Sequence, residues 1–337
     1  MDASSHIKNS RVLVTGGAGF IGSNLVDALL KQGNYVRVLD DFSTGFEENL
    51  VDHYDFQQEL SKNNHFDLIR GDIRDESTCA KACQGIDYVL HQAALGSVPR
   101  SINDPIRTNS VNITGFLNIL VAARDAKVKR FVYAASSSTY GDSKELPKLE
   151  DNIGKPLSPY AVTKYVNELY ADVFYKTYGL ETVGLRYFNV YGRRQTPNGA
   201  YAAVIPLFVD SLIKHKSPQI NGDGATSRDF TYIDNVIKMN QLAALTPKSE
   251  AFGQVFNCAC GSSTSLNELF SVLRKELSHF DPEIANTEVT YGPERVGDIR
   301  DSLADVSKAK NLLNYSDVIH FEQGIKDCVQ WYWNNLK

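Results

Sequence analysis

Residues 11–22, Arg11-Val-Leu-Val-Thr-Gly-Gly-Ala-Gly-Phe-Ile-Gly22, decide the fold of this chain. The aliphatic first half of the stretch is typical of a parallel strand that is buried on both faces. Gly16, Gly19 and Gly22 follow with a spacing that allows a tight turn, a close backbone approach to a pyrophosphate and close packing of the next helix. We therefore predict a strand, a turn and a helix over about residues 20–31, whose positive end faces the phosphates of a dinucleotide.

A second strand that ends in acidic residues completes the pattern. Tyr35-Val-Arg-Val-Leu-Asp40 is typical of such a strand, and its last residue lies about 20 positions after the turn, where dinucleotide folds bind ribose hydroxyls. Asp41 comes next, and no Arg follows directly, so a 2′-phosphate would meet negative charge. The sequence therefore predicts NAD rather than NADP.

Composition limits the class of protein. With 337 residues, 42% hydrophobic and 22% charged, the chain resembles a globular enzyme of two lobes. The net charge of -5 gives no basic surface for nucleic acid, and neither an apolar run nor a signal-like start predicts a membrane segment, so we expect a cytoplasmic enzyme. The odd number of cysteines, without Cys-x-x-Cys spacing, indicates packed thiols rather than a metal site or disulfides: Cys79, Cys83, Cys258, Cys260 and Cys328.

The following segments predict an open, doubly wound α/β sheet. We expect a loop and one helix over residues 41–65, then strands over 66–70, 87–94 and 129–135. Asp72 and Ile73, after the first of these strands, are placed to hydrogen-bond the adenine. His91 lies inside the second, where a satisfied core histidine is the simpler interpretation.

Hydroxyl groups gather after the strand over 129–135. Ser136-Ser-Ser-Thr139 lies at the carboxyl edge of the sheet, where open α/β sheets bind ligands. A helix is expected over residues 108–126, and Asn112 near its start would reach the loop beneath a nicotinamide. By itself the serine run is also consistent with an ordinary turn, so its meaning depends on the next helix.

That helix supplies a phenol and an amine on one face. In Ser158-Pro-Tyr160-Ala-Val-Thr-Lys164, Ser158 suits the N-cap, and Tyr160 and Lys164 are four residues apart. A phenol has a pKa of about 10, so acting as a base at pH 7 needs about 4 kcal/mol. A neighbouring ammonium supplies about that much, and an oxidised nicotinamide adds positive charge. We predict Tyr160 as the base, Lys164 as its electrostatic partner, and a serine hydroxyl as proton relay.

With these motifs the chain is identified as a member of the extended short-chain dehydrogenase/reductases. The resemblance covers essentially the whole chain, and it is closest to the nucleotide-sugar 4-epimerases, in particular bacterial UDP-N-acetylglucosamine 4-epimerases of surface-polysaccharide pathways. It implies a Rossmann-like doubly wound parallel sheet with a smaller α/β substrate-binding C-terminal lobe, and NAD that stays bound through turnover. The motifs are Thr15-Gly-Gly-Ala-Gly-Phe-Ile-Gly22, Gly71-Asp-Ile73, His91-Gln-Ala-Ala94, Ser136-Ser-Ser-Thr-Tyr-Gly141, Tyr160-x-x-x-Lys164 and Leu185-Arg-Tyr-Phe-Asn189.

The resemblance assigns three groups of site residues, and no metal ligands. The catalytic residues are Ser136, Tyr160 and Lys164. The cofactor-binding residues are Gly16, Gly19, Phe20, Ile21, Gly22, Asp40, Asp41, Phe42, Ser43, Thr44, Gly45, Asp72, Ile73, Gln92, Ala93, Ala94, Asn112, Tyr160, Lys164 and Tyr187. The substrate-binding residues are Gly96, Ser97, Ser136, Ser137, Ser138, Asn189, Gln195, Ala203, Val204, Asn221, Arg228, Arg295, Asp298 and Ser302.

Within the substrate group, the resemblance gives Arg228 and Arg295 the UDP phosphates, Asp298 a ribose hydroxyl and Asn189 the diphosphate. It implies a cycle in which Tyr160 takes the proton of the sugar C4 hydroxyl while hydride passes to NAD. The resulting 4-keto sugar turns about its link to UDP, and the hydride returns to its opposite face. Most of the binding affinity must then lie in UDP.

Two residues depart from the family pattern, one at the cofactor and one at the substrate. Gly96 stands where galactose epimerases usually carry a Lys, which puts one cofactor phosphate contact in doubt. Ser302 stands where epimerases restricted to UDP-glucose and UDP-galactose can place a Tyr. A small residue leaves room for a 2-acetamido group, and a large ring would collide with it. We therefore expect UDP-GlcNAc and UDP-GalNAc as preferred substrates, with some activity on UDP-glucose and UDP-galactose.

Domain division and rival functions complete the expectations. The NAD-binding domain is expected over 1–186 plus 231–260, the UDP-sugar-binding domain over 187–230 plus 261–337, and a homodimer through helices over 108–126 and 159–178. One rival is a nucleotide-sugar 4,6-dehydratase or uronate decarboxylase or epimerase of the same fold; dehydratases need an Asp-Glu pair where this chain has Ser137 and Ser138. The other is a catalytically silent NAD-binding regulator, which would usually have lost Tyr160 or Lys164.

Overall fold

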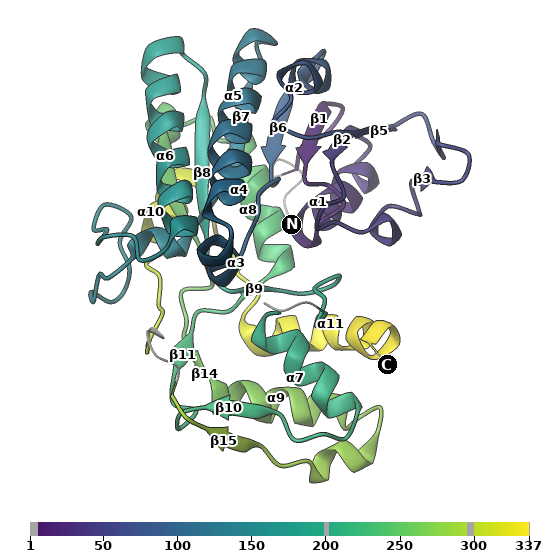
Figure 1. Cartoon of the computed structure of the whole chain (residues 1–337), viewed down its shortest axis with the longest axis vertical. Coiled ribbons are helices and arrows are strands. Elements are labelled where there is room, and N and C mark those ends of the chain that lie inside the picture. Colours follow the sequence, from purple (N-terminus) through teal and green to yellow (C-terminus); the bar gives the residue numbers. More distant parts are fainter. Residues whose placement is uncertain (1–5, 199–201, 295–299, 337) are drawn as a thin grey trace.

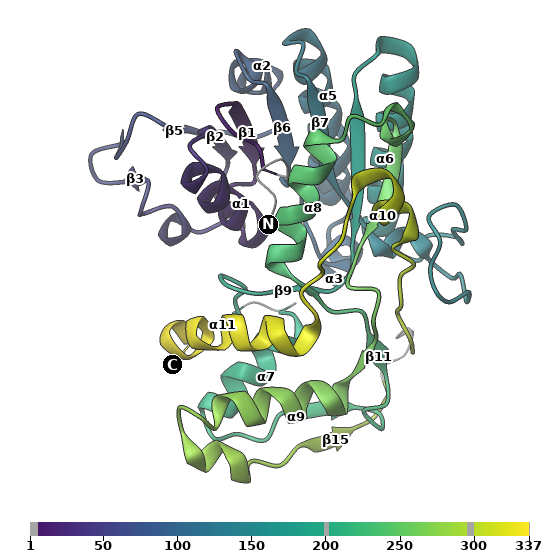
Figure 2. The same ribbon diagram turned by 180° about the vertical axis from the view of Figure 1, so that it is seen from behind.

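The computed structural model describes residues 6–198, 202–294 and 300–336 of the chain. It has two lobes: one holds a large sheet with helices on both faces, and the other is smaller and mostly helical (Figure 1). Figure 2, turned by 180°, shows the C-terminal helix in the smaller lobe.

Seven parallel strands form the sheet of the larger lobe, in the order β13-β8-β7-β6-β1-β2-β5. Strand order reverses between β1 and β6, where a ligand crevice is expected outside the carboxyl ends of the strands. The strands are β1 (Arg11–Thr15), β2 (Tyr35–Asp40), β5 (Phe66–Arg70), β6 (Tyr88–His91), β7 (Arg130–Ser136), β8 (Thr182–Tyr187) and β13 (Gln254–Cys258).

Helices cover both faces of this sheet, which explains why β1 and β7 are nearly continuous apolar runs. On one face α1 (Phe20–Lys31) packs beside α8 (Ile233–Leu245). The other face carries α2 (Glu76–Cys83), α5 (Phe116–Asp125) and α6 (Pro159–Tyr178). This is the predicted Rossmann-like class, with α8 and β13 in the same lobe.

In the residues that the structure describes, the smaller lobe has three α-helices, a 3-10 turn (Pro282–Asn286) and very short strand pairs. Its helices are α7 (Val204–Ile213), α9 (Leu266–Leu277) and α11 (Phe321–Leu336), which pack on one another. Its strands pair as β10 (Gln219–Asn221) with β15 (Thr290–Gly292) and β11 (Ser227–Arg228) with β14 (Thr264–Ser265). Between the lobes β9 (Val190–Tyr191) pairs with β12 (Thr231–Tyr232).

Helix α10 (Ser307–Leu313) departs from the expected domain division. It lies in the stretch assigned to the second lobe, yet it packs against α8 and β13 of the first. The Thr246 hydroxyl donates to the Leu312 carbonyl at 2.9 Å, and Lys308 Nζ donates to Gln254 Oε1 at 3.1 Å. The chain therefore crosses between the lobes once more than the sequence indicates.

Three predicted elements differ from the structure. The segment 41–65 contains no α-helix; it forms a 3-10 turn (Glu47–Asn49) and a hairpin of β3 (Tyr54–Asp55) and β4 (Leu60–Ser61), and the rings of Phe42 and Tyr54 pack against Phe56. The helix expected over 108–126 begins earlier, at α4 (Pro105–Asn109), capped by Asp104, and passes through a π-helical segment (Ser110–Gly115) into α5. Strand β6 ends at His91 and not at residue 94.

The described residues contain no helix with both the length and the apolar character needed to cross a bilayer. All five cysteines are buried as free thiols, in agreement with the packed thiols that the sequence predicts.

Candidate active site

A pocket opens at the carboxyl edge of the sheet, next to β1 and β6, between which the strand order reverses. Its walls contain every predicted cofactor residue except Phe42 and Asn112, together with the predicted catalytic residues Ser136, Tyr160 and Lys164 and the predicted substrate residue Gly96. The predicted site residues do not include several apolar and small residues that also line the pocket: Leu39, Gly71, Leu95, Val111, Ala134 and Ala135.

The glycine turn forms the floor of this pocket. Gly16 has φ +68°, and a Cβ there would lie 2.7 Å from the Ala93 backbone nitrogen at the end of β6. A Cβ on Gly22 would lie 2.1 Å from the Gly16 carbonyl oxygen, so helix and turn touch through backbone alone. Within the described residues no side chain caps the N-terminus of α1 at Gly19. The free N–H groups of its first turn suit a pyrophosphate.

Asp40 fixes the loop beside that turn. Its carboxylate accepts from the backbone nitrogens of Ala18 and Phe42, both at 2.8 Å. Burial raises the pKa of Asp40 above its ordinary value, although these two donors act in the opposite direction. Each oxygen keeps a lone pair for a ribose hydroxyl, and the residue also sets the position of residues 41–45 along the pocket wall.

Asn112 and Phe42 are the two predicted cofactor residues that do not line the pocket. Asn112 clamps the loop after β6: its Oδ1 accepts from Leu95 N at 2.8 Å and its Nδ2 donates to Leu95 O at 3.0 Å. This is the loop that the sequence expects Asn112 to reach. Phe42 turns away from the pocket and packs its ring against Phe56, with the Arg70 guanidinium 4.6 Å from its ring centroid.

His91 is a satisfied core residue, as its sequence context indicates. It is buried, and its Nδ1 lies 2.8 Å from the hydroxyl of Thr15. Burial lowers its pKa to about 3, with the Lys164 charge acting in the same direction. The imidazole is therefore neutral and has no titrating role at physiological pH.

Ser136, Tyr160 and Lys164 meet in the pocket from two elements. Ser136 ends β7, and the other two lie one turn apart on α6, whose N-terminus Ser158 caps by accepting from Ala161 N at 3.1 Å. The Ser136 hydroxyl hydrogen-bonds with Tyr160 and accepts from the Ser138 hydroxyl at 2.9 Å. The serine oxygen thus connects the phenol to the following turn.

The charge state of this group differs from the sequence expectation that Lys164 lowers the pKa of Tyr160. Burial raises the pKa of Tyr160, and the hydrogen bond with Ser136 is the contact that opposes it. Lys164 Nζ donates to the Ala134 carbonyl at 2.8 Å, and burial lowers the pKa of Lys164 to about 8. Formation of a phenolate therefore requires more positive charge in the pocket than Lys164 provides.

Of the predicted substrate residues that the structure describes, Ser136 and Gly96 line the pocket and the others do not. Ser97 caps α3 (Val98–Asn103), and Ser137 and Ser138 begin the 3-10 turn Ser137–Tyr140. The remaining described ones lie at the junction of the lobes or in the second lobe: Asn189, Gln195, Ala203, Val204, Asn221, Arg228 and Ser302. Arg295 and Asp298 lie outside the described residues.

Two of these segments lie side by side. Ser302 N donates to the Ser227 carbonyl at 3.1 Å, and Arg228 Nη1 donates to the carbonyls of Ser227 and Arg300 at 2.8 and 3.1 Å. The sequence missed Asp229, which is fully buried and accepts from the backbone nitrogens of Cys260, Gly261 and Ala304. The one sequence feature that could have indicated a role for Asp229 is its position next to Arg228. Asp229 thereby fixes the strand that carries Arg228 relative to the segment that carries Ser302.

Comparison with known proteins agrees with this architecture. Residues 12–259 match the NAD dependent epimerase/dehydratase family. The chain belongs to this family. NAD is accordingly its cofactor, and the glycine turn, the uncapped start of α1 and the acidic pair Asp40 and Asp41 fit a dinucleotide.

Individual members of the epimerase/dehydratase family are similar over nearly the whole chain. A UDP-N-acetylglucosamine 4-epimerase from Methanobrevibacter ruminantium, solved with UDP-N-acetylmuramic acid, is 37% identical with a TM-score of 0.88, covering 97% of this chain and 99% of that one. A UDP-glucose 4-epimerase from Thermotoga maritima, solved with UDP-glucose, is 35% identical with a TM-score of 0.85, covering 97% and 100%. The UDP-glucose 4-epimerase of Mycolicibacterium smegmatis is 34% identical over 96% of this chain and 99% of its own length.

Proposed function

We propose that this protein is a UDP-sugar 4-epimerase that interconverts UDP-GlcNAc and UDP-GalNAc with tightly held NAD, for the synthesis of surface-polysaccharide precursors. One observation carries the proposal: Ser136, Tyr160 and Lys164 gather in the same pocket as the glycine turn and the acidic pair after β2. A base and a hydride acceptor must both reach one sugar carbon, and this pocket offers places for both.

The residues have separate parts in the proposed reaction. NAD, when bound by the residues that line this pocket, would supply the redox chemistry as acceptor and donor of the hydride of the sugar C4. Tyr160 takes the proton of the C4 hydroxyl on oxidation and gives it back on reduction. Ser136 would hold the sugar oxygen and the phenol together, and the Lys164 ammonium and the positive nicotinamide would together stabilise the phenolate. Arg228, Arg295 and Asp298 would hold UDP so that the sugar can turn.

The N-acetyl preference rests on Ser302. Its small side chain lies beside the strand that carries Arg228, so a bulkier residue there would narrow the substrate side of the site. A hydrophobic or steric clash with one added group typically changes discrimination by about 10- to 200-fold. The similar M. ruminantium structure is named as a UDP-N-acetylglucosamine 4-epimerase, and this supports the same substrate class for this chain.

The rival functions find less support at the same positions. A 4,6-dehydratase requires an acid and a base beside the sugar C5 and C6, and Ser137 and Ser138 offer hydroxyls that titrate too far from neutrality for that work. A silent NAD-binding regulator has no need of the Tyr160 phenol, yet Tyr160 is half-buried and hydrogen-bonds with Ser136 inside the pocket.

We also propose a homodimer. The face of α6 that points away from the sheet exposes Val162, Leu169 and Val173, and the neighbouring helices α3 and α4 expose Ile102 and Ile106, the latter at 83%. An apolar surface built from adjacent helices is typical of a subunit contact. The division into an NAD-binding domain and a UDP-sugar-binding domain stays part of this proposal, with α10 attached to the first.

The test is an assay of purified protein with UDP-GlcNAc, UDP-GalNAc, UDP-glucose and UDP-galactose, without added NAD, in which products are resolved by their C4 configuration. We expect each N-acetylhexosamine to be converted to its C4 epimer, faster than the two plain hexoses. A plain hexose pair converted faster would contradict the N-acetyl preference. No conversion of any of the four would contradict the epimerase proposal.

A further inference from the structure

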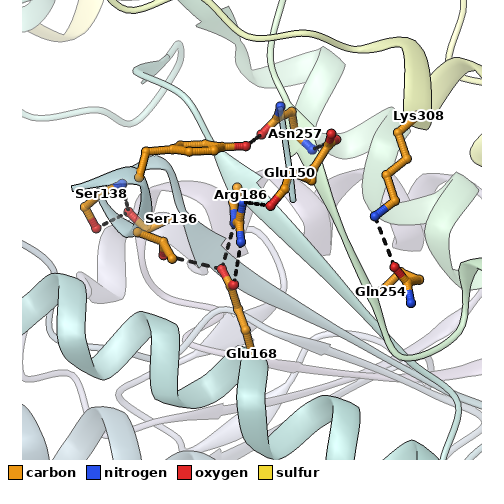
Figure 3. Close-up of polar contacts among 10 residues, drawn as sticks. Ser136, Ser138, Glu150, Glu168, Arg186, Gln254, Asn257 and Lys308 are labelled. Carbon is orange, nitrogen blue, oxygen red and sulfur yellow. Dashed lines mark hydrogen bonds and ion pairs between the residues drawn. The ribbon is translucent and has the colours of Figure 1, made fainter. Parts of the chain in front are cut away.

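A buried ion pair lies directly behind the catalytic residues. Arg186 of β8 and Glu168 of α6 form a fork in which Nε donates to Oε1 at 2.9 Å and Nη2 donates to Oε2 at 2.7 Å. Their side chains are only 3% and 6% exposed. Figure 3 shows Arg186 between Glu168 and Glu150. Neither residue lines the pocket.

The pair holds the turn that follows Ser136. The Thr139 hydroxyl donates to Glu168 Oε1 at 3.3 Å, and the Arg186 guanidinium lies 4.8 Å from the ring centroid of Tyr140. Arg186 Nη1 also donates to the Glu150 carbonyl at 2.8 Å. The fork therefore joins the end of β7, the helix with Tyr160 and Lys164, strand β8 and the segment around residue 150.

Two side chains continue this network to the edge of the sheet. The Tyr140 hydroxyl donates to Asn257 Oδ1 at 2.6 Å, and Asn257 N donates to Glu150 Oε1 at 2.8 Å. The whole set is buried, and each carboxylate in it has at least one donor. Buried polar groups that are fully hydrogen-bonded fix one geometry, because any other arrangement leaves a charge without a partner.

Glu168 also lies one helical turn after Lys164, on the same face of α6. Burial lowers the pKa of Lys164, and the negative charge of Glu168 is the contribution that raises it again. A buried ion pair is seldom retained for stability alone, since an apolar pair of similar size often serves as well. Its position between the serine turn and the lysine suggests another use.

We propose that the pair Glu168–Arg186 is the positioning unit of this site: it holds the turn after Ser136 against α6 and keeps the Lys164 ammonium charged. The proposal rests on the proposed function for its catalytic meaning, but the state of Lys164 can be measured without turnover. Arg186 limits the effect of Glu168, because its own positive charge acts on Lys164 in the opposite direction.

Other charged or titratable groups around Lys164 are accounted for. His91 of β6 is neutral, and Tyr133 of β7 and Tyr187 of β8 have pKa values raised by burial, so all three are uncharged near pH 7. On the helices across α6, Arg107 is exposed and Arg100 donates to the Gly96 carbonyl. Glu168, paired with Arg186, is then the charged group that acts on Lys164, and Arg124 and Asp125 of α5 are paired to each other.

The experiment is an NMR titration of the full chain labelled with 13Cε-lysine. The Lys164 signal is identified by its loss in Lys164→Met, and its titration midpoint is compared in wild type, Glu168→Gln and Arg186→Met. We expect Glu168→Gln to move the midpoint down by about one pH unit or more, and Arg186→Met to move it up. A merely structural disturbance would not move the Lys164 midpoint in opposite directions in the two variants.

The matched control is Glu181→Gln, which breaks the ion pair at the amino end of β7, where Arg130 Nη2 lies 2.8 Å from Glu181 Oε2. It should leave the Lys164 midpoint unchanged. Glu168→Asp keeps the charge and should restore a midpoint near that of wild type. An unchanged Lys164 midpoint in Glu168→Gln would overturn the proposal. If Glu168→Gln does not fold, Arg186→Met decides alone, and a Lys164 midpoint that stays the same or falls in that variant would overturn the proposal.

Turnover gives the second readout. If the proposed epimerase activity is present, the alkaline limb of kcat against pH should move to lower pH in Glu168→Gln, and not in Glu181→Gln. A uniform loss of kcat without this movement would contradict the role assigned to Glu168. Absence of turnover in wild type would instead contradict the proposed function, and the NMR result would still decide the positioning role.

Discussion

The two lobes build their parts of the site in different ways. In the larger lobe, the ends of adjacent strands of one sheet supply the pocket, and each of its key side chains follows a strand or starts a helix. In the smaller lobe, two-residue strands carry Arg228 and its neighbours, and the buried Asp229 holds them by contacts with residues far along the chain. Under the proposed function, the regular lobe would carry the chemistry and the irregular lobe would select the sugar.

The largest expected effect tests the regular lobe. Tyr160→Phe removes the proton acceptor and should lower kcat by about 10³-fold or more on every UDP-sugar, because general base catalysis is lost whatever the sugar. The assay with C4-resolved products measures this. Tyr165→Phe on the same helix, outside the pocket, is the control and should keep its activity. A loss confined to one sugar pair would contradict the division between the lobes.

The next effect tests the irregular lobe. Ser302→Tyr should lower kcat/KM for UDP-GlcNAc by about 100-fold while keeping part of the activity on UDP-glucose, since the ring would occupy the space of the acetamido group. The exposed Ser271 of α9 provides the control variant Ser271→Tyr, which should change neither. Equal losses on both substrates would show that residue 302 does not select the sugar.

A third effect concerns the stability cost of the catalytic lysine. The pKa of Lys164 falls from 10.5 to about 8 on folding, so the fold binds this proton less tightly than the unfolded chain does. The contribution of Lys164 to the free energy of unfolding is therefore highest above pH 10.5. It falls as the pH is lowered from 10.5 to 8, and below pH 8 the full cost of burying the charge is present. At pH 7 the cost is about 3 kcal/mol. Lys164→Met removes it but also the hydrogen bond to Ala134, which is worth about 1 kcal/mol.

The net expectation for Lys164→Met is therefore a gain of about 2 kcal/mol in the free energy of unfolding at pH 7, with activity lost. Urea unfolding of dinucleotide-stripped protein at pH 7 and pH 10.5 measures it. The gain should vanish at the higher pH. A variant that is less stable than wild type at pH 7 would contradict the charge cost assigned to the burial of Lys164.

The smallest expected effect on activity comes from changes on the outer face of α6, which we expect to alter subunit association. Leu169 is 50% exposed there, whereas the opposite face of the helix carries Tyr160 and Lys164. Leu169→Glu should shift the protein from dimer to monomer in sedimentation velocity, because it places a charge in an apolar contact. Leu60→Glu in the hairpin, an exposed leucine at 59%, should leave the association state unchanged. A wild-type monomer would contradict the proposed dimer.

How much could be predicted from the sequence depends on whether a feature is formed by neighbouring or by distant residues. Gly16, Gly22 and Ser158 act locally, so short motifs located the pocket, the turn and the start of α6. The hairpin over residues 54–61 and the return of α10 depend on packing between distant side chains, and no local pattern predicts them. The charge state of Tyr160 also depends on burial, which the spacing of Tyr160 and Lys164 does not contain.

The most direct test of the central claim follows one atom. UDP-GlcNAc labelled with deuterium at the sugar C4 is incubated with purified protein in ordinary water without added NAD, and the C4 position of the UDP-GalNAc formed is analysed by NMR. The account predicts that the deuterium is retained at C4, because the bound cofactor takes it and returns it within one site. UDP-GalNAc with solvent hydrogen at C4, or no UDP-GalNAc at all, would contradict it.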